Sequence, residues 1–140
     1  MTQGRALEIL LIEDSDEDAE LTIRALRQGR ITNAVHRVVD GEQALQVLFG
    51  EERVSPKLVL LDLKLPKVDG LEVLQRVKND SSTRSIPVVV LTSSREERDL
   101  VDSYRLGVNS YIVKPVDFEQ FVAAVVQVGL YWTILNEAAR

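Results

Sequence analysis

The chain contains no cysteine, and it has one histidine and one tryptophan among its 140 residues. Without cysteine and with a single histidine, a zinc site built from these residue types is excluded, and a Ser-His or Cys-His catalytic pair is disfavoured. The absence of thiols also fits a reducing compartment. A domain of this size buries roughly two-thirds of its unfolded surface, so it can fold without a disulfide or a structural metal.

Basic residues and long apolar runs are also few. The chain has 17 Lys and Arg against 22 Asp and Glu, a formal net charge of -5. Nucleic-acid binding is therefore disfavoured, because it needs a basic face that neutralises phosphates. The apolar run at residues 9–12 stops at two acids and is too short for a signal peptide or a membrane span. We expect a single cytoplasmic domain over residues 1–140, with no nucleic-acid or membrane partner.

Short runs rich in Val, Ile and Leu predict β-strands. The runs are residues 8–12, 58–61, 88–91 and 111–113, with a weaker run at 35–39. Such near-continuous apolar runs are typical of strands that are covered on both faces. Between them, apolar residues at helical spacing predict helices: Ala19, Ile23 and Leu26, with Ser15 as N-cap; Ala44, Leu45 and Leu48; Leu71, Leu74 and Val77; Val101, Tyr104 and Leu106; and a last helix from Asp117 to about Leu135.

This alternation of strands and helices predicts an α/β fold. The right-handed crossover rule and the length favour a doubly wound open parallel sheet with helices on both faces. A (β/α)8 barrel would need about 250 residues, so it is excluded. No linker or repeat marks a domain boundary.

Polar side chains follow four of the predicted strands. Glu13 and Asp14 follow the first strand, Asp62 the third, Thr92 the fourth and Lys114 the fifth. The carboxyl ends of parallel strands share one edge, where ligands bind, so we expect these residues to converge. Three carboxylates repel one another and would favour a hard cation such as Mg²⁺. One carboxylate could then be a nucleophile in phosphoryl transfer, with lysine and metal stabilising the transferred charge.

Each of these residues also has a purely structural interpretation. Asp14 alone could be a helix cap, Thr92 alone a cap or turn residue, and Lys114 alone a solvated side chain. Asp62 is harder to explain in this way, because an unpaired charge at the end of a central strand is costly. The coincidence at four strand ends therefore favours a functional site.

The sequence resembles the response-regulator receiver domains of two-component signalling over about residues 7 to 128. The matching segments are residues 9–14 (ILLIED), 60–70 (LLDLKLPKVDG), 90–93 (VLTS) and 111–115 (YIVKP). The resemblance implies a flavodoxin-like sheet of strand order 2-1-3-4-5. It also implies that a histidine kinase phosphorylates Asp62, and that the chain catalyses only its own phosphorylation and dephosphorylation.

The resemblance further implies a metal site that binds Mg²⁺. The side chains of Asp14 and Asp62 and the backbone carbonyl of Lys64 would bind the ion directly, and Glu13 would act through a water. The pair Glu13-Asp14 departs from the two aspartates that many receivers have. Lys64 and Ser94 occupy positions that tune the lifetime of the phosphoryl group in this family.

The remaining implied roles concern the phosphoryl group and the response to it. Thr92 and Lys114 would contact the phosphoryl group, and Tyr111 would be the aromatic switch residue that moves with Thr92. The peptide bond between Lys114 and Pro115 is expected to be cis, although only about 5–6% of X-Pro bonds are cis in folded proteins.

Two other functions compete with this interpretation. An aspartate-nucleophile phosphohydrolase would carry a second aspartate two residues after the nucleophile, where this chain has Lys64. A receiver-like interaction module that is never phosphorylated would not need the intact set of Asp62, Thr92 and Lys114.

The end of the chain carries more apolar side chains than one domain requires. At 100° per residue, Ala124, Val128, Tyr131 and Leu135 form a stripe beside the expected core stripe of the last helix. A helix that covers one sheet face needs one apolar stripe, so the surplus predicts a homodimer through the last helix. The alternative is that the extension, residues 129–140, folds back over its own domain.

The end of the chain also narrows the resemblance. Residues 131–135 (YWTIL), together with 92–94 (TSS) and 114–118 (KPVDF), resemble the small stand-alone regulators of bacterial and cyanobacterial phytochromes. This resemblance implies a phytochrome-like sensor histidine kinase as partner and no output domain.

Overall fold

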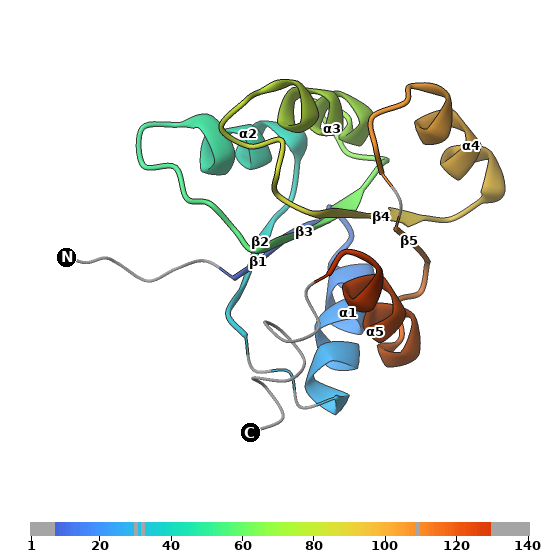
Figure 1. Ribbon diagram of the computed structural model, residues 1–140. Coiled ribbons are helices and arrows are strands. Elements are labelled where there is room, and N and C mark those ends of the chain that lie inside the picture. Colours follow the sequence, from blue (N-terminus) through green and yellow to red (C-terminus); the bar gives the residue numbers. More distant parts are fainter. Residues whose placement is uncertain (1–7, 30, 32, 109, 130–140) are drawn as a thin grey trace.

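The computed structural model describes residues 8–29, 31, 33–108 and 110–129. Within them, strands and helices alternate along the chain (Figure 1). The strands are β1 (Ile9–Ile12), β2 (Val35–Val38), β3 (Leu58–Asp62), β4 (Val88–Thr92) and β5 (Tyr111–Val113). The helices are α1 (Asp16–Gln28), α2 (Gly41–Phe49), α3 (Gly70–Asn79), α4 (Arg95–Ser103) and α5 (Phe118–Gln127).

The strands form one parallel sheet of order β2-β1-β3-β4-β5. Helices α1 and α5 cover one face of this sheet, and α2, α3 and α4 cover the other (Figure 1). The predicted doubly wound fold of order 2-1-3-4-5 is therefore confirmed. No helix among the described residues is both long and apolar enough to cross a membrane.

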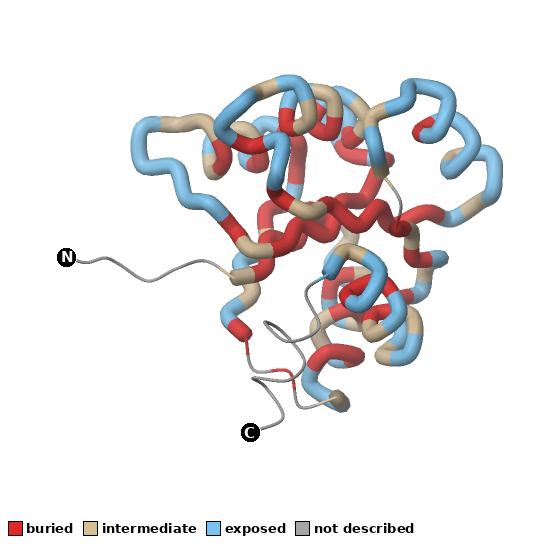
Figure 2. The backbone as a smooth tube through the Cα atoms, in the orientation of Figure 1, coloured by how far each residue is buried: buried red, intermediate tan, exposed pale blue. Residues whose placement is uncertain are grey.

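The sheet separates two apolar cores, one on each face. Along β1, Ile9 and Leu11 pack into the core beneath α1 and α5, while Leu10 and Ile12 pack into the core beneath the other three helices. Every residue of β1, β3 and β4 is buried, as the continuous apolar runs predicted (Figure 2). Strand ends are therefore the places where this sheet can hold polar chemistry.

A polar side chain begins each of these helices. The N-caps are Ser15, Asp40, Asp69, Ser94 and Asp117, and each accepts a hydrogen bond from the N–H three residues on. Such a cap contributes about 1 kcal/mol. The prediction for Ser15 is confirmed.

Gly70 sets how closely α3 approaches the loop after β3. Its N–H donates to the Leu63 carbonyl over 2.9 Å, and an added Cβ would lie 2.4 Å from the Asp62 carbonyl oxygen. Only glycine fits there without moving the backbone. This close approach fixes the loop that carries Lys64.

Two predicted helix ends are wrong. Helix α4 ends at Ser103, so Tyr104 lies outside it with a 46% exposed side chain, and Leu106 follows in the loop. Helix α5 ends at Gln127 rather than near Leu135, and Gly129 has φ +82°. That left-handed conformation suits glycine and interrupts regular helical winding.

The apolar stripe predicted for dimerisation is consequently not formed as expected. Ala124 is 2% exposed and belongs to the core beneath α1 and α5, so its assignment to an outer face is wrong. Val128 is half-buried and packs against the same core. Tyr131 and Leu135 lie outside the described residues.

Candidate functional site

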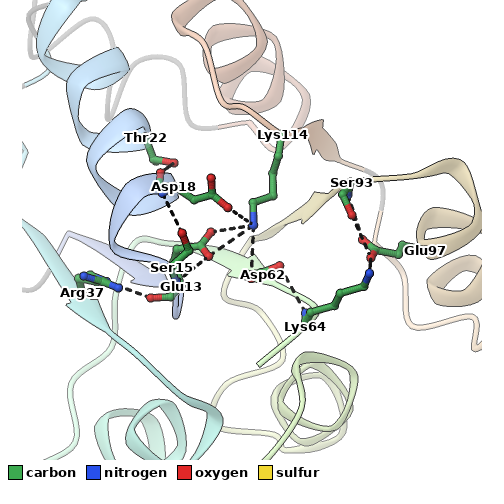
Figure 3. A network of polar contacts seen from close by, with 10 residues as sticks. All are labelled: Glu13, Ser15, Asp18, Thr22, Arg37, Asp62, Lys64, Ser93, Glu97 and Lys114. Carbon is green, nitrogen blue, oxygen red and sulfur yellow. Dashed lines mark hydrogen bonds and ion pairs between the residues drawn. The ribbon is translucent and has the colours of Figure 1, made fainter. Parts of the chain in front are cut away.

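The predicted site residues converge at the carboxyl edge of the sheet. Glu13 directly follows β1, Asp62 ends β3 and Lys114 directly follows β5, and their side chains meet in one buried cluster (Figure 3). Glu13 is 0% exposed and Asp62 is 4% exposed. The parallel register brings together residues that are about a hundred positions apart in sequence.

Lys114 is the centre of this cluster. Its Nζ lies 3.2 Å from Glu13 Oε1, 3.4 Å from Asp62 Oδ2 and 2.9 Å from Asp18 Oδ2. The backbone N–H of Lys114 also donates to the Thr92 carbonyl over 2.8 Å, which fixes the end of β5 beside β4. The peptide bond from Lys114 to Pro115 is cis, as expected.

The cluster holds more negative charge than Lys114 can balance. Burial, and then repulsion from Asp62, raise the pKa of Glu13 to about 7. Burial likewise raises the pKa of Asp62, although Lys114 opposes the change. Burial works against the charged form of Lys114, but the carboxylates of Asp18, Asp62 and Glu13 outweigh it and raise the pKa of the lysine. One further cation would let all the acids ionise.

Three acids of the site are arranged to bind such a cation. Glu13, Asp14 and Asp62 each offer one carboxylate oxygen, and these atoms lie within 4.8 Å of one another. Glu13 Oε1 is buried and accepts no hydrogen bond among the described residues, although the Lys114 ammonium lies 3.2 Å away. Asp14 is exposed, which leaves the site open on one side. Oxygen donors of this kind fit a hard divalent cation.

Lys64 lies beside the same edge. Its backbone N–H donates to Asp62 Oδ1 over 3.3 Å and so helps to orient the carboxylate. Its side chain points to Glu97 instead of to Asp62, with 3.2 Å between Nζ and Oε2 (Figure 3). The binding of a metal by the Lys64 carbonyl stays a prediction.

The two predicted switch residues differ in their surroundings. Thr92 ends β4 and is 2% exposed. Tyr111 begins β5 and is half-buried; its hydroxyl donates to Asp102, and the Arg98 guanidinium lies 4.7 Å from the ring centroid. Both contacts hold the Tyr111 ring against α4.

Sequence reasoning missed two polar partners of the site. Asp18 is absent from the predicted site, yet it makes the shortest of the three contacts to Lys114. Glu97 is likewise absent from the predicted site, yet it binds Lys64 and Ser93. The spacing of Ser94 and Glu97, which is that of a capping box, was the available signal for Glu97.

The doubly wound parallel sheet thus gathers acids, a buried threonine and a lysine at its carboxyl edge. The family model "Response regulator receiver domain" matches residues 9–126. The chain therefore belongs to the response-regulator receiver family, and the resemblance seen in the sequence is confirmed.

Curated relatives cover most of this chain. It is 44% identical over 133 residues to the probable methanogenesis regulatory protein FilR2 of Methanothrix harundinacea, covering 93% of this chain and 86% of that protein. It is 40% identical over 128 residues to the response regulator Rcp1 of Synechocystis, covering 89% of this chain and 87% of Rcp1.

Solved structures give the same assignment. The bacteriophytochrome response regulator RtBRR is 53% identical with a TM-score of 0.85, over 96% of this chain and 84% of RtBRR. Rcp1 in its Mn²⁺-bound form is 38% identical with a TM-score of 0.69, over 89% and 92% of the two chains. The phosphorylated cyanobacterial phytochrome response regulator RcpA is 38% identical with a TM-score of 0.72, over 92% and 95%.

Proposed function

We propose that this chain is a phosphoacceptor response regulator that a histidine kinase phosphorylates on Asp62 and that signals through protein–protein contacts. The observation that carries the proposal is the position of the Asp62 carboxylate at the end of β3, 3.4 Å from the Lys114 ammonium and beside two further acids. The chain would catalyse only its own phosphorylation and dephosphorylation, in the cytoplasm.

The transfer step follows from this geometry. An oxygen of Asp62 attacks phosphorus, the bond from phosphorus to the donor histidine nitrogen breaks, and that imidazole nitrogen takes up a proton. Lys114 stays beside the phosphoryl oxygens and stabilises their charge. The Lys64 N–H donates to Asp62 Oδ1, and the other oxygen, Oδ2, which lies 3.4 Å from Lys114 Nζ, would be the attacking atom.

We propose Mg²⁺ as the bound cation. Asp14 and Asp62 would hold it through their side chains, Lys64 through its carbonyl and Glu13 through a water. The ion would offset carboxylate charge and accept a phosphoryl oxygen. Support comes from the three converging carboxylates and from the Mn²⁺-bound structure of Rcp1.

We expect the response to run from Thr92 to Tyr111. A phosphoryl group on Asp62 would draw the Thr92 hydroxyl towards it, and the Tyr111 ring would turn into the vacated space. The ring would then lose its contacts with Asp102 and Arg98 on α4, so the outer surface of α4 and β5 would change. The change is a population shift between two packings.

A phytochrome-type sensor kinase is the proposed partner. RtBRR and RcpA are both described as phytochrome response regulators. Phosphotransfer assays with phytochrome and non-phytochrome kinases test the choice; preferential phosphotransfer from a non-phytochrome kinase would contradict it.

A homodimer through the last helix stays a proposal, but on a different face of α5 from the predicted stripe. Val126 on α5 is 54% exposed and Val113 on the adjacent strand β5 is 58% exposed. Such apolar surface favours self-association. Light scattering of Val126→Asp tests this surface, with Gln127→Asp as the matched control. A variant that stays as dimeric as the wild type would exclude it.

The decisive experiment is phosphorylation with a small acyl phosphate and Mg²⁺. We expect a base-labile mass gain of one phosphoryl group on Asp62, and none in Asp62→Asn, which is nearly isosteric and should fold. An aspartate phosphohydrolase would instead turn over an external phosphate ester continuously, and a non-phosphorylated module would show no mass gain. Unchanged phosphorylation of Asp62→Asn would refute the assignment.

A further inference from the structure

A second group of polar and charged side chains lies at the outer rim of the site. We call Lys64, Ser93 and Glu97 the rim clamp (Figure 3). Glu97 accepts from the Ser93 N–H over 3.0 Å and from the Ser93 hydroxyl over 3.2 Å, and its Oε2 lies 3.2 Å from Lys64 Nζ. The clamp therefore joins the loop after β3 to the loop after β4.

The donors bound by Glu97 adjoin the residues that handle the phosphoryl group. Lys64 is two residues after Asp62, and Ser93 directly follows Thr92. A phosphoryl group brings a charge of about -1.5 to -2 and three acceptor oxygens. Its oxygens would compete with the Glu97 carboxylate for the Lys64 ammonium and for the Ser93 N–H.

The two ends of the clamp differ in how firmly they are held. The Glu97 side chain is only 13% exposed, whereas that of Lys64 is 78% exposed. Because a partly exposed ion pair contributes little free energy, Glu97 can retain Lys64 against the phosphoryl group only part of the time, and its effect on Lys64 should be modest.

We propose that Glu97 is a positioning residue that holds the Lys64 ammonium off the phosphoryl group and thereby shortens the lifetime of phosphorylated Asp62. The proposal rests on the proposed function. A released Lys64 would pair with the phosphoryl oxygens, stabilise the phosphorylated state and shield phosphorus from water. When Glu97 retains Lys64, water can still approach phosphorus.

The step under control is hydrolysis of the acyl phosphate. A water oxygen bonds to phosphorus while the bond from phosphorus to the Asp62 oxygen breaks. The products are the Asp62 carboxylate and inorganic phosphate, which keeps both water protons as H₂PO₄⁻. Glu97 touches neither the water nor phosphorus in this account and acts only through Lys64.

A purely structural role of Glu97 can be separated from this one. Ser94 Oγ accepts the Glu97 N–H over 3.2 Å, so these residues also cap α4. The cap uses the backbone N–H of residue 97, so Glu97→Gln keeps the cap and removes the charge. Capping alone does not explain the contact to Lys64, which comes from another strand end. Glu96, exposed in the same helical turn, gives the matched control.

The test measures the decay of phosphorylated protein by intact mass after the phosphodonor is removed. We expect Glu97→Gln to decay about threefold more slowly than the wild type, as the loss of a moderately exposed ion pair implies. Glu96→Gln should decay at the wild-type rate. In a Lys64→Gln, Glu97→Gln double variant the decay should be no slower than in Lys64→Gln alone. Melting temperature and Mg²⁺ affinity of Glu97→Gln should stay unchanged.

The outcomes distinguish this proposal from the proposed function. A wild type that takes up no phosphoryl group would overturn both. If the wild type is phosphorylated but Glu97→Gln decays as Glu96→Gln does, only the role of Glu97 is overturned. A slower decay that persists without the Lys64 ammonium would also overturn it, because the effect would not act through Lys64.

Discussion

Two lysines at the same edge of the sheet are each bound by carboxylates, but they differ in burial. Lys114 meets three acids and its side chain is 16% exposed, whereas Lys64 meets one described carboxylate and is 78% exposed. Water screens the Lys64 pair, so its free energy is small and it can exchange partners. The Lys114 pairs lie in a low-dielectric surrounding, where removing one partner leaves uncompensated charge.

The largest expected effect is on stability when each lysine is removed. At pH 8, Lys114→Met should lower the free energy of unfolding by about 3 kcal/mol, because buried carboxylates lose their cation. Lys64→Met should lower it by less than about 0.5 kcal/mol. Urea denaturation followed by circular dichroism measures both. Equal losses would show that burial does not separate the two lysines.

Mg²⁺ affinity should show the next largest difference between the acids of the buried cluster and Glu97 at the rim. Asp14→Ala should weaken Mg²⁺ binding about 100-fold and Glu13→Ala about 10-fold, because only Asp14 is expected to contact the ion directly. Glu97→Ala, at the rim, should leave the affinity unchanged. Titration calorimetry provides the constants. A larger loss in Glu13→Ala than in Asp14→Ala would reverse the assigned roles.

The pH dependence of stability should sharpen the contrast further. The folded-state pKa of Glu13 is about 7, above its ordinary value of 4.5, so the folded protein holds the proton more tightly than the unfolded chain does. The contribution of protonated Glu13 to the free energy of unfolding is therefore complete below pH 4.5, and it is lost as the pH rises through about 7. Without metal, the wild type should lose about 3 kcal/mol over this interval relative to Glu13→Gln.

The control for this measurement is Glu17→Gln, which removes an exposed acid from the same helix that carries Asp18. It should follow the wild-type pH profile. Saturating Mg²⁺ should flatten the wild-type profile, since the ion favours the ionised acids. A wild-type profile parallel to that of Glu13→Gln without metal would mean that Glu13 titrates normally.

The fold and most of the inner site could be predicted from the sequence, because strands buried on both faces leave a continuous apolar signal that stops at the sheet edge. Glu13, Asp62 and Lys114 each stand at such a stop, and a parallel sheet has one carboxyl edge. Asp18 could not be placed in this way, since its contact with Lys114 depends on where the first turn of α1 lies relative to the segment after β5. The contact between Glu97 and Lys64 likewise depends on tertiary packing and could not be predicted from the strand ends.

Helix ends were less predictable for a related reason. Regular winding from Asp117 assumes that the helix continues through Gly129, but that residue has φ +82°. The face of α5 that holds Ala124 is covered by α1, which the apolar spacing of α5 alone does not reveal. Local patterns predict that a helix forms, whereas its end and covered faces depend on its neighbours.

The smallest expected difference in stability is between substitutions of Asp18 and Asp16, two acids in the first turn of α1. Asp18 binds Lys114 over 2.9 Å with a 35% exposed side chain, and Asp16 binds Arg37 over 2.8 Å with a 94% exposed side chain. Both acids favour the N-terminal end of α1 similarly through the helix dipole. The difference between the two substitutions therefore isolates the burial of the ion pair.

We expect Asp18→Asn to lower the free energy of unfolding by about 1 kcal/mol and Asp16→Asn by less than about 0.5 kcal/mol, measured at pH 7 without metal. Raising the salt concentration to about 1 M should diminish the effect of Asp16→Asn more than that of Asp18→Asn, because salt screens exposed pairs most. Asp18→Asn also leaves Lys114 with only Glu13 and Asp62, so the Asp62 carboxylate gains a larger share of the ammonium. Equal losses and equal salt sensitivity in the two variants would place Asp18 with the solvated pairs of the surface and confine the buried cluster to the strand ends.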